Sequence, residues 1–388
     1  MTILALAFVL AAPALFLYAY VVYPALLWLA GLTVRLDREI AEMEWPTVTV
    51  TLPVYNEERN IRNKLEELLQ LDYPAERLQI LVISDASTDD TDRIVGEYAA
   101  RDVELLRLAT RRGKTAAENA AGRAARGTII VNNDATVRIP AHALKELVRV
   151  FVDPTIGVAS GRDVSVGVGT SESNRGESQY VGYEMWLRSL ETRLGSIVGA
   201  SGCFYGIRSA IYNSSFPEEL SRDFASALMA RAHGLRAVSV ADAVCYVPRA
   251  AALGTEFRRK VRTMARGLET LWQWRSMLNP FQHGVFAFML LSHKLCRWLT
   301  YLLVPFAFIG LAMLSLSSAP GAILLGVAIL GVVIAAIVWR RAQRAVRVNR
   351  VEAFFAFSLA SVCAGFLAWV KVLRRQQSAI WEPTRRPA

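Results

Sequence analysis

The chain has 388 residues, of which 53% are hydrophobic, and a formal net charge of +10. This length allows one good-sized domain together with membrane segments. Much of the basic excess lies beside apolar segments, at 257–275, 340–350 and 371–387, which favours anionic lipid over nucleic acid as its partner. The four cysteines are far apart, which argues against a zinc site or a disulfide framework.

The amino-terminal segment is apolar throughout. No charged side chain occurs in the first 34 residues, and residues 3–31 are long enough to cross a bilayer. A cleaved signal peptide would have a basic region before a shorter apolar run. We therefore expect residues 1–33 to be a retained transmembrane anchor.

Residues 34–280 are expected to form one soluble domain, in which strand-like and helix-like runs alternate. Strands are predicted at 47–52, ended by Pro53, and at 80–84, 103–108, 128–132 and 156–161. Helices are predicted after Pro53, with Glu57 and Glu58 early and Leu69 late, and at 90–99, 114–125, 180–194 and 221–233. Residues 165–180 are rich in Gly and Ser and are expected to form a loop. The alternation predicts an α/β fold with a mostly parallel sheet and helices on both faces.

Polar residues follow the ends of these strands. Asp85 comes directly after 80–84, Asp134 follows 128–132, and Lys114 opens the helix at 114–125. In α/β sheets the carboxyl ends of strands and the starts of helices meet at one edge, where nucleotides and phosphates bind. The pattern therefore indicates a nucleotide-sugar site. The competing interpretations are a helix cap for Asp85 and a solvated basic loop for Lys114.

Two carboxylates are candidates for the chemistry. Asp134 could hold Mg²⁺ or Mn²⁺, because such ions are bound through one or two carboxylates together with substrate phosphates. Asp223 opens the helix at 221–233 and could act as a general base. The alternative interpretation of Asp134 is a turn residue at the end of a strand. The alternative for Asp223 is an acidic residue that stabilises the first turn of its helix.

The carboxyl-terminal part mixes basic and apolar segments. In the run 256–275, one helical face carries or adjoins Arg258, Arg259, Arg262 and Arg266. These arginines could bind a diphosphate or anionic lipid or form a solvated face. Residues 281–299 are predicted to be an interfacial helix, and residues 300–373 contain further transmembrane segments. A basic tail follows at 374–388. Because positive charge beside membrane segments marks the cytoplasmic side, the domain is expected on the cytoplasmic side of a membrane.

Four segments in order resemble the family 2 glycosyltransferases, and most closely the membrane-embedded branch of hyaluronan, chitin-oligosaccharide and cellulose synthases. They are PVYNEE at 53–58, SDASTDDT at 84–91, GKTAAEN at 113–119 and NDAT at 133–136. The stretch LSHKLCRW at 291–298 is similar to the membrane-entry helix of such enzymes. The resemblance implies a glycosyltransferase A-type domain between membrane helices.

The resemblance also implies a role for each residue of the donor site. Asp85 would contact the uracil of a UDP-sugar, near Pro53, Tyr55 and Glu57. Lys114 would lie by the nucleotide, and Asp134 would be the first carboxylate of a metal-binding Asp-x-Asp motif.

The downstream motifs are matched in the same way. Asp223, in Ser-Arg-Asp, corresponds to the base of a Thr-Glu-Asp motif. Arg259 and Arg262 correspond to the first residue and the arginine of Gln-x-x-Arg-Trp, whose arginine contacts the diphosphate. The tail residues Trp381, Thr384 and Arg385 resemble the Trp-Gly-Thr-Arg gating loop of hyaluronan synthases.

Four positions depart from the family pattern. Thr136 stands for the second Asp of Asp-x-Asp, and Arg222 for the Glu before the base. The Gln and Trp of Gln-x-x-Arg-Trp are Arg259 and Thr263, and Glu382-Pro383 replaces the single Gly of the tail motif.

The leading hypothesis is an inverting β-glycosyltransferase that moves a hexose or N-acetylhexosamine from a UDP-sugar to an exopolysaccharide or envelope glycan, with export as an added role. Its partners would be the UDP-sugar, a glycan acceptor, the lipid bilayer and subunits for export or synthesis. One alternative is transfer to a polyprenyl phosphate. Another is a degenerate nucleotide-binding subunit of a synthase.

Overall fold

The computed structural model describes residues 2–34, 44–166, 172–248, 253–343 and 350–376. The chain divides into two compact units. One unit comprises the described residues within 1–30, 169–179 and 250–376, and the other comprises those within 31–168 and 180–249. The second unit contains the sheet, and the first, here called the helical unit, contains the segment from 253 onward. The expected domain bounds at 34 and 280 stay predictions.

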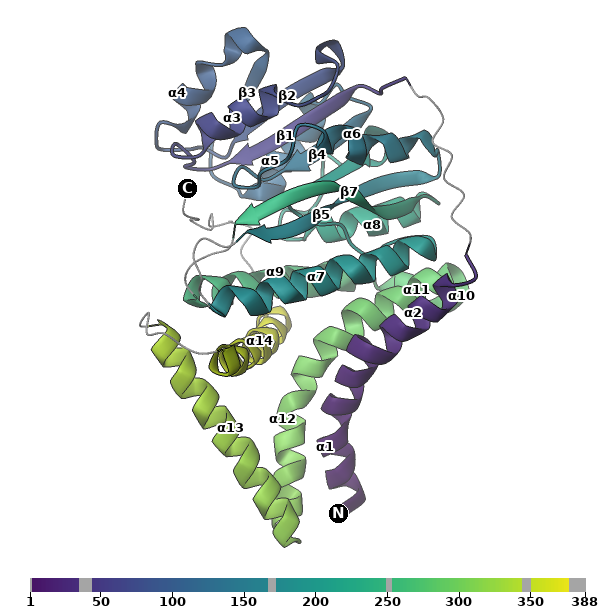
Figure 1. Ribbon diagram of the computed structural model, residues 1–388, viewed down its shortest axis with the longest axis vertical. Helices are drawn as coiled ribbons and strands as arrows, with labels where there is room; N and C mark the ends of the chain where they lie inside the picture. Colours follow the sequence, from purple (N-terminus) through teal and green to yellow (C-terminus); the bar gives the residue numbers. More distant parts are fainter. Residues whose placement is uncertain (1, 35–43, 167–171, 249–252, 344–349, 377–388) are drawn as a thin grey trace. The chain divides into compact units, whose positions relative to one another are not determined.

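The sheet unit is built on seven strands in the order β3-β2-β1-β4-β6-β5-β7 (Figure 1). The strands are β1 Val48–Val54, β2 Leu78–Ser84, β3 Val103–Arg107, β4 Ile129–Asn133, β5 Ile156–Val166, β6 Phe204–Arg208 and β7 Arg236–Pro248. All neighbouring pairs are parallel except those of β6, which runs antiparallel to both β4 and β5. The predicted mostly parallel α/β sheet is confirmed.

Helices cover both faces of this sheet. They are α3 Ile61–Leu69, α4 Thr91–Gly96, α5 Lys114–Ala124, α6 Ala143–Val148 and α8 Arg222–Ala232. Helix α7 Glu172–Arg193 belongs to this unit from residue 180 onward. Short 3₁₀ turns occur at Ala75–Arg77, Ala99–Arg101, Arg149–Val152, Ser209–Ile211 and Arg275–Leu278, the last of them in the helical unit.

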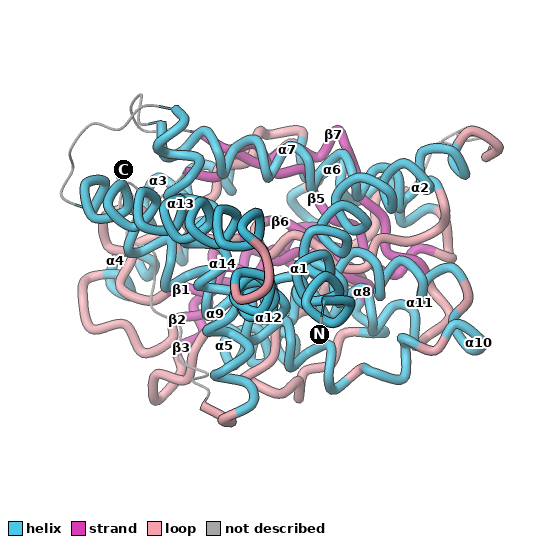
Figure 2. The backbone as a smooth tube through the Cα atoms, turned by 90° about the horizontal axis from the view of Figure 1, so that it is seen from below, coloured by secondary structure: helices cyan, strands magenta, loops and turns pink. Residues whose placement is uncertain are grey.

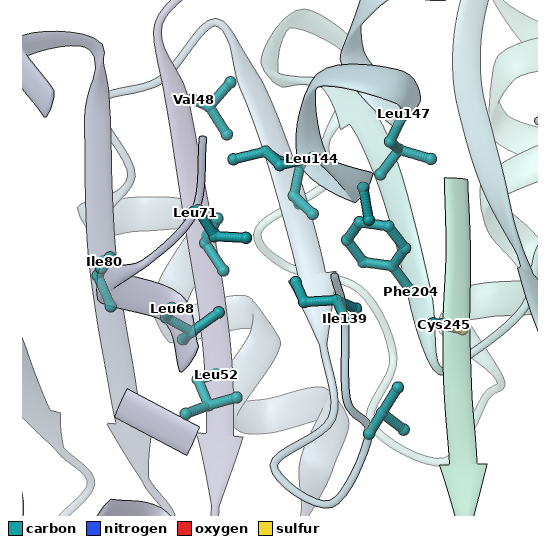
Figure 3. Close-up of a cluster of buried hydrophobic side chains, with 14 of the residues drawn as sticks. Val48, Leu52, Leu68, Leu71, Ile80, Ile139, Leu144, Leu147, Phe204 and Cys245 are labelled. Carbon is teal, nitrogen blue, oxygen red and sulfur yellow. The ribbon is translucent and has the colours of Figure 1, made fainter. Parts of the chain in front are cut away.

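Alternating side chains of the central strands form two cores. Val48, Leu52 and Ile80 pack on one face with side chains of α3 and α6 (Figure 3). Leu81 and Ile83 point to the opposite face and pack against the alanines of α5. Since both faces of the sheet are buried, the sequences of the strands are nearly continuous apolar runs. The packing on α5 holds the first residue of that helix at the carboxyl edge of the sheet.

Two sequence predictions about boundaries are wrong. Strand β1 does not end at Pro53 but continues to Val54, with Pro53 opposite Ile83 of β2. The pairing of β1 with β4 stops at Thr51, so the missing N–H of Pro53 falls where one side of the strand is unpaired. The expected loop at 165–180 is helical from Glu172, where α7 begins; glycine weakens a helix by only about 1 kcal/mol, which a helix of this length tolerates.

The helical unit begins with α1 Thr2–Leu17, a π-helical turn Tyr18–Val22 and α2 Tyr23–Gly31. It continues with α9 Leu253–Gln273, α10 Pro280–His283, α11 Val285–Leu290, a second π-helical turn Leu291–Leu295, α12 Cys296–Ser315, α13 Ala319–Gln343 and α14 Arg350–Leu373. Among the residues that the structure describes, four helical stretches are long and apolar enough to cross a membrane: Thr2–Gly31, Val285–Ser315, Ala319–Arg341 and Phe354–Leu373. The helix from Val285 to Ser315 is continuous, so no break separates the expected interfacial helix at 281–299 from the apolar segment that begins at 300.

Close packing joins the helices of this unit. Helices α1 and α12 lie side by side (Figures 1 and 2), and a Cβ atom at Gly310 would lie 2.6 Å from the carbonyl oxygen of Ala5. Helix α14 packs on α9, where Lys260 donates from Nζ to the Ser361 hydroxyl at 3.0 Å. A glycine thus allows the close approach of α1 and α12, and a polar contact fastens α14 to α9.

Candidate active site

Asp85 fastens the loop that leads into α5. It follows β2 directly, is buried, and its two carboxylate oxygens accept the backbone N–H groups of Arg112 and Gly113, each at 2.8 Å. Gly113 has φ +101°, a conformation that favours glycine. A carboxylate has about four acceptor positions, so Asp85 keeps capacity for a further donor. Its contact with uracil remains a prediction.

The loop after β1 carries the other residues predicted to surround the base. Tyr55 has its ring covered by the Arg111 guanidinium, 3.8 Å from the ring centroid. Glu57 is buried, and its carboxylate accepts a hydrogen bond from the Asn60 side chain at 2.8 Å. Tyr55 and Arg111 thus form a stacked pair beside the strand ends, whereas Glu57 contributes to the structure of its own loop.

Lys114 lies among carboxylates at the start of α5. Its ammonium donates to Asp134 Oδ1 at 2.5 Å and to the carbonyl oxygen of Gly202 at 3.0 Å, and it lies 4.0 Å from Glu118 Oε1. Burial acts to lower the pKa of Lys114, but Asp134 and Glu118 outweigh it and the pKa is raised. Lys114 is therefore a permanently charged cation at this edge.

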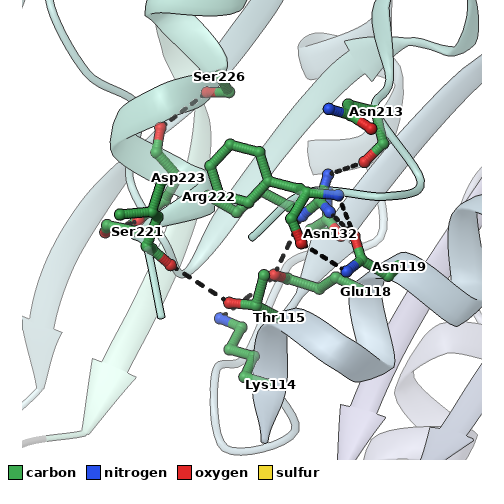
Figure 4. Close-up of polar contacts among 12 residues, drawn as sticks. Lys114, Thr115, Glu118, Asn119, Asn132, Asn213, Ser221, Arg222, Asp223 and Ser226 are labelled. Atoms are coloured by element: carbon green, nitrogen blue, oxygen red, sulfur yellow. Dashed lines mark hydrogen bonds and ion pairs between the residues drawn. The ribbon is translucent and has the colours of Figure 1, made fainter. Parts of the chain in front are cut away.

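Asp223 reaches the same place from α8. Its carboxylate accepts a hydrogen bond from the Ser221 hydroxyl (Figure 4). A Cβ atom added to Gly202 would lie 2.6 Å from Asp223 Oδ2. The backbone of Gly202 therefore has Asp223 on one side and the Lys114 ammonium on its carbonyl. The structure brings together Lys114, Asp134 and Asp223, which the sequence placed at separate strand and helix ends.

The segment between β6 and α8 is tied to α5 although it has little regular structure. The Asn119 side chain donates to the carbonyl oxygen of Phe216 at 2.8 Å and accepts the Phe216 N–H at 3.1 Å. The Tyr212 hydroxyl donates to the carbonyl oxygen of Glu118 at 2.9 Å, and Arg123 donates to that of Ser214 at 2.9 Å. Residues 212–223, here called the α8 approach, are thus held against α5 along its length.

The residues present fit a divalent metal only in part. Among the residues described, no three His, Cys, Asp or Glu side chains are grouped to hold a metal ion. The Asp134 side chain is 27% exposed, and one of its oxygens accepts from Lys114. Thr136, which follows two residues later, supplies a hydroxyl in place of a second carboxylate. One partly exposed carboxylate fits Mg²⁺ or Mn²⁺ that is held jointly with a substrate diphosphate.

Other predicted site residues lie elsewhere in the chain. Arg259 belongs to α9 of the helical unit, where it forms an ion pair with Glu256 at 2.6 Å. Arg262 lies on the same helix. The tail residues Trp381, Thr384 and Arg385 are outside the described residues. The roles of these five residues, like that of Asp85, stay predictions.

Two residues of the site were missed by sequence reasoning. Glu118 was not considered, although it lies four residues after Lys114 and hence on the same face of α5. The carbonyl group of Gly202 carries no side-chain signal, and only the fold reveals its contact with Lys114.

Comparison with known proteins decides the family. The model of "Glycosyl transferase family 2" matches residues 49–216. An N-acetylglucosaminyltransferase of Bradyrhizobium elkanii is 30% identical over 146 residues, which are 37% of this chain and 76% of that protein. The chain belongs to glycosyl transferase family 2.

This family 2 protein matches longer relatives as well. An N-acetylglucosaminyltransferase of Bradyrhizobium diazoefficiens is 28% identical over 260 residues, which are 61% of this chain and 52% of that protein. The chain spans about half the length of the first curated relatives it matches, 52% in two cases.

A solved structure supports the fold of this family 2 protein over almost its whole length. A mannosyltransferase of Pyrobaculum calidifontis, in complex with GDP-Man and Mn²⁺, has a TM-score of 0.73 and 23% sequence identity, and the match covers 97% of this chain and 99% of that one. The glycosyltransferase A-type fold with flanking apolar helices, which the sequence predicted, is confirmed.

Proposed function

We propose that this family 2 protein is an inverting glycosyltransferase that moves a hexose or N-acetylhexosamine from a UDP-sugar to an acceptor hydroxyl. The observation that carries the proposal is the meeting of Asp223, Lys114 and Asp134 around Gly202. A base, a cation and a carboxylate at one sheet edge are the groups that transfer from a nucleotide diphosphate requires.

Asp223 acts as the general base in this mechanism. The acceptor hydroxyl attacks the anomeric carbon from the face opposite the leaving group, and its proton passes to the Asp223 carboxylate. The new bond joins the acceptor oxygen to the anomeric carbon, while the bond from that carbon to the diphosphate oxygen breaks. The hydrogen bond from Ser221 orients the carboxylate.

Lys114 stabilises the departing nucleotide. Its charge is fixed in place by Asp134 and the Gly202 carbonyl before the substrate arrives, so no reorganisation is needed when negative charge develops on the diphosphate. Mg²⁺ or Mn²⁺, held by Asp134 and the diphosphate, would add further positive charge at the same place.

The acceptor is proposed to be an exopolysaccharide or another envelope glycan, with export as a further role. Four apolar helices support a location in a membrane. The basic segments beside them support a bacterial inner membrane with the catalytic unit in the cytoplasm.

A screen for UDP release tests the proposed function. Membranes containing the protein are supplied with UDP-hexoses, UDP-N-acetylhexosamines and GDP-sugars, each with Mg²⁺ or Mn²⁺. We expect release of UDP from at least one UDP-sugar and incorporation of the radiolabelled sugar into a product that organic solvent does not extract. An extractable product would indicate a lipid acceptor. Binding of UDP without release from any donor would refute the proposal.

Gly202→Ala is expected to lower turnover with little effect on stability. The new Cβ would meet Asp223 Oδ2 at 2.6 Å, and the carboxylate would rotate away because it is the flexible partner. A displacement of about 1 Å at a reacting group costs roughly 100-fold in rate. The measurement is UDP release per UDP-binding site. Gly96→Ala is the matched control, since a Cβ atom there meets nothing within 4 Å.

A further inference from the structure

Arg222 is a buried guanidinium directly before the proposed base. Its side chain is 1% exposed and lies between the rings of Tyr212 and Phe216, 4.6 and 4.8 Å from their centroids. It donates to the carbonyl oxygen of Asn213 at 2.9 Å and to Asn119 Oδ1. Figure 4 shows it reaching from the start of α8 toward α5. Arg222 therefore points into the protein and fixes the first turn of α8.

Glu118 is the anionic partner of Arg222. Its side chain is 4% exposed, and its carboxylate lies between two cations, with Oε2 3.5 Å from Arg222 Nε and Oε1 4.0 Å from Lys114 Nζ. Burial raises the pKa of Glu118, and Lys114 and Arg222 oppose that shift. The carboxylate of Glu118 thus lies within 4.0 Å of both Lys114, whose nearer partner is Asp134, and Arg222.

These contacts join the two elements that carry the proposed chemistry. Lys114 opens α5 and Asp223 lies in the first turn of α8, while Glu118 is one turn after Lys114 and Arg222 is one residue before Asp223. We infer that Glu118 and Arg222 are positioning residues, which set where the Asp223 carboxylate lies relative to Lys114. This inference rests on the proposed function of the site.

A contribution to stability alone would not explain why this position is charged. Well-packed apolar residues in place of a buried ion pair are often neutral or stabilising, so burial of the pair is weak evidence for a stabilising role. The planar guanidinium, by contrast, fixes the orientation of the Arg222 side chain. It donates hydrogen bonds to Asn213 and Asn119, lies over two aromatic rings and forms an ion pair with Glu118.

The test separates positioning from folding by counting UDP-binding sites. We would compare Arg222→Lys, Arg222→Gln, Glu118→Gln and the double Glu118→Gln/Arg222→Gln variant with the wild type. Calorimetric titration with UDP gives the number of sites and the affinity, and UDP release gives kcat and KM for the donor. Arg222→Lys keeps the positive charge but loses the planar guanidinium and its fixed set of donors. It therefore tests the positioning of Asp223 even if the neutral variants do not fold.

We expect kcat per UDP-binding site to fall roughly 10- to 100-fold in the Arg222 variants, with KM and UDP affinity changed less than about threefold. The loss of kcat in the double variant should be no greater than that in the less active of the two single Gln variants, since the two residues act together. Arg208→Lys is the matched control: this arginine at the far end of β6 donates to three backbone carbonyl groups and stacks on Phe151. It should lower stability and leave kcat per site unchanged.

Wild-type kcat per site in Arg222→Lys or in Arg222→Gln would overturn the inference, as would a rise in KM with constant kcat. A wild type that binds UDP and releases none from any donor gives a different result: the proposed function fails, and this inference falls with it.

Discussion

Replacing Asp223 by asparagine is expected to lower turnover by about 10³-fold, the range in which general base catalysis contributes. Asparagine keeps the size of the side chain and an oxygen for the Ser221 hydroxyl, but it cannot take the proton of the acceptor. Lys114, Asp134 and Asp85 are unchanged, so UDP should bind as it does to the wild type. The measurement is UDP release together with a calorimetric titration of UDP.

The control for this substitution is Glu219→Gln. Glu219 is an exposed carboxylate four residues earlier in the same α8 approach, and neutralising it should leave turnover within twofold or so of the wild type. Asp223→Asn with more than a tenth of wild-type turnover would rule out Asp223 as the base.

Lys114→Met is expected to weaken UDP binding by about 10- to 100-fold, the worth of a charge-assisted hydrogen bond. Because Asp134 and Glu118 raise the pKa of Lys114 against the effect of burial, the lysine stays charged from pH 6 to 9. The loss of affinity should therefore be the same across that range. Calorimetric titrations of wild type and variant at several pH values measure both effects.

Lys145→Met provides the comparison for this variant, since Lys145 of α6 forms an ion pair with Asp72 at 2.6 Å and contacts none of the site residues described above. UDP affinity should not change there. An unchanged affinity in Lys114→Met, or a difference that grows toward low pH, would exclude the role assigned to Lys114.

Local signals made the parallel part of the fold predictable. Apolar strands that end in Asp85 and Asp134, and a glycine before Lys114, indicated which edge of the sheet carries the site. The antiparallel strand β6 and the last strand β7 were not predicted, because their pairing depends on partners far away in the chain. The continuation of β1 through Pro53 also depends on pairing, since it requires one side of the strand to be free.

Contacts between charged groups that are far apart in the chain could not be predicted from the sequence either. The sequence marked Arg222 as a departure from the family pattern, but its partner Glu118 lies 104 residues earlier, and no spacing rule connects them. The contact of Lys114 with Asp134 could be anticipated from strand ends, whereas the arrangement of both around Gly202 required the fold.

The attachment of the α8 approach to α5 has a consequence for the strength of substrate binding. Hydrogen bonds with Glu118, Asn119 and Arg123 fix the α8 approach while the chain folds. Its conformational entropy is therefore lost during folding and does not oppose association with a ligand. A nucleotide sugar that binds at Asp223 would therefore meet a preorganised segment, and the free energy of its contacts there would remain available to hold the donor and to favour the transition state.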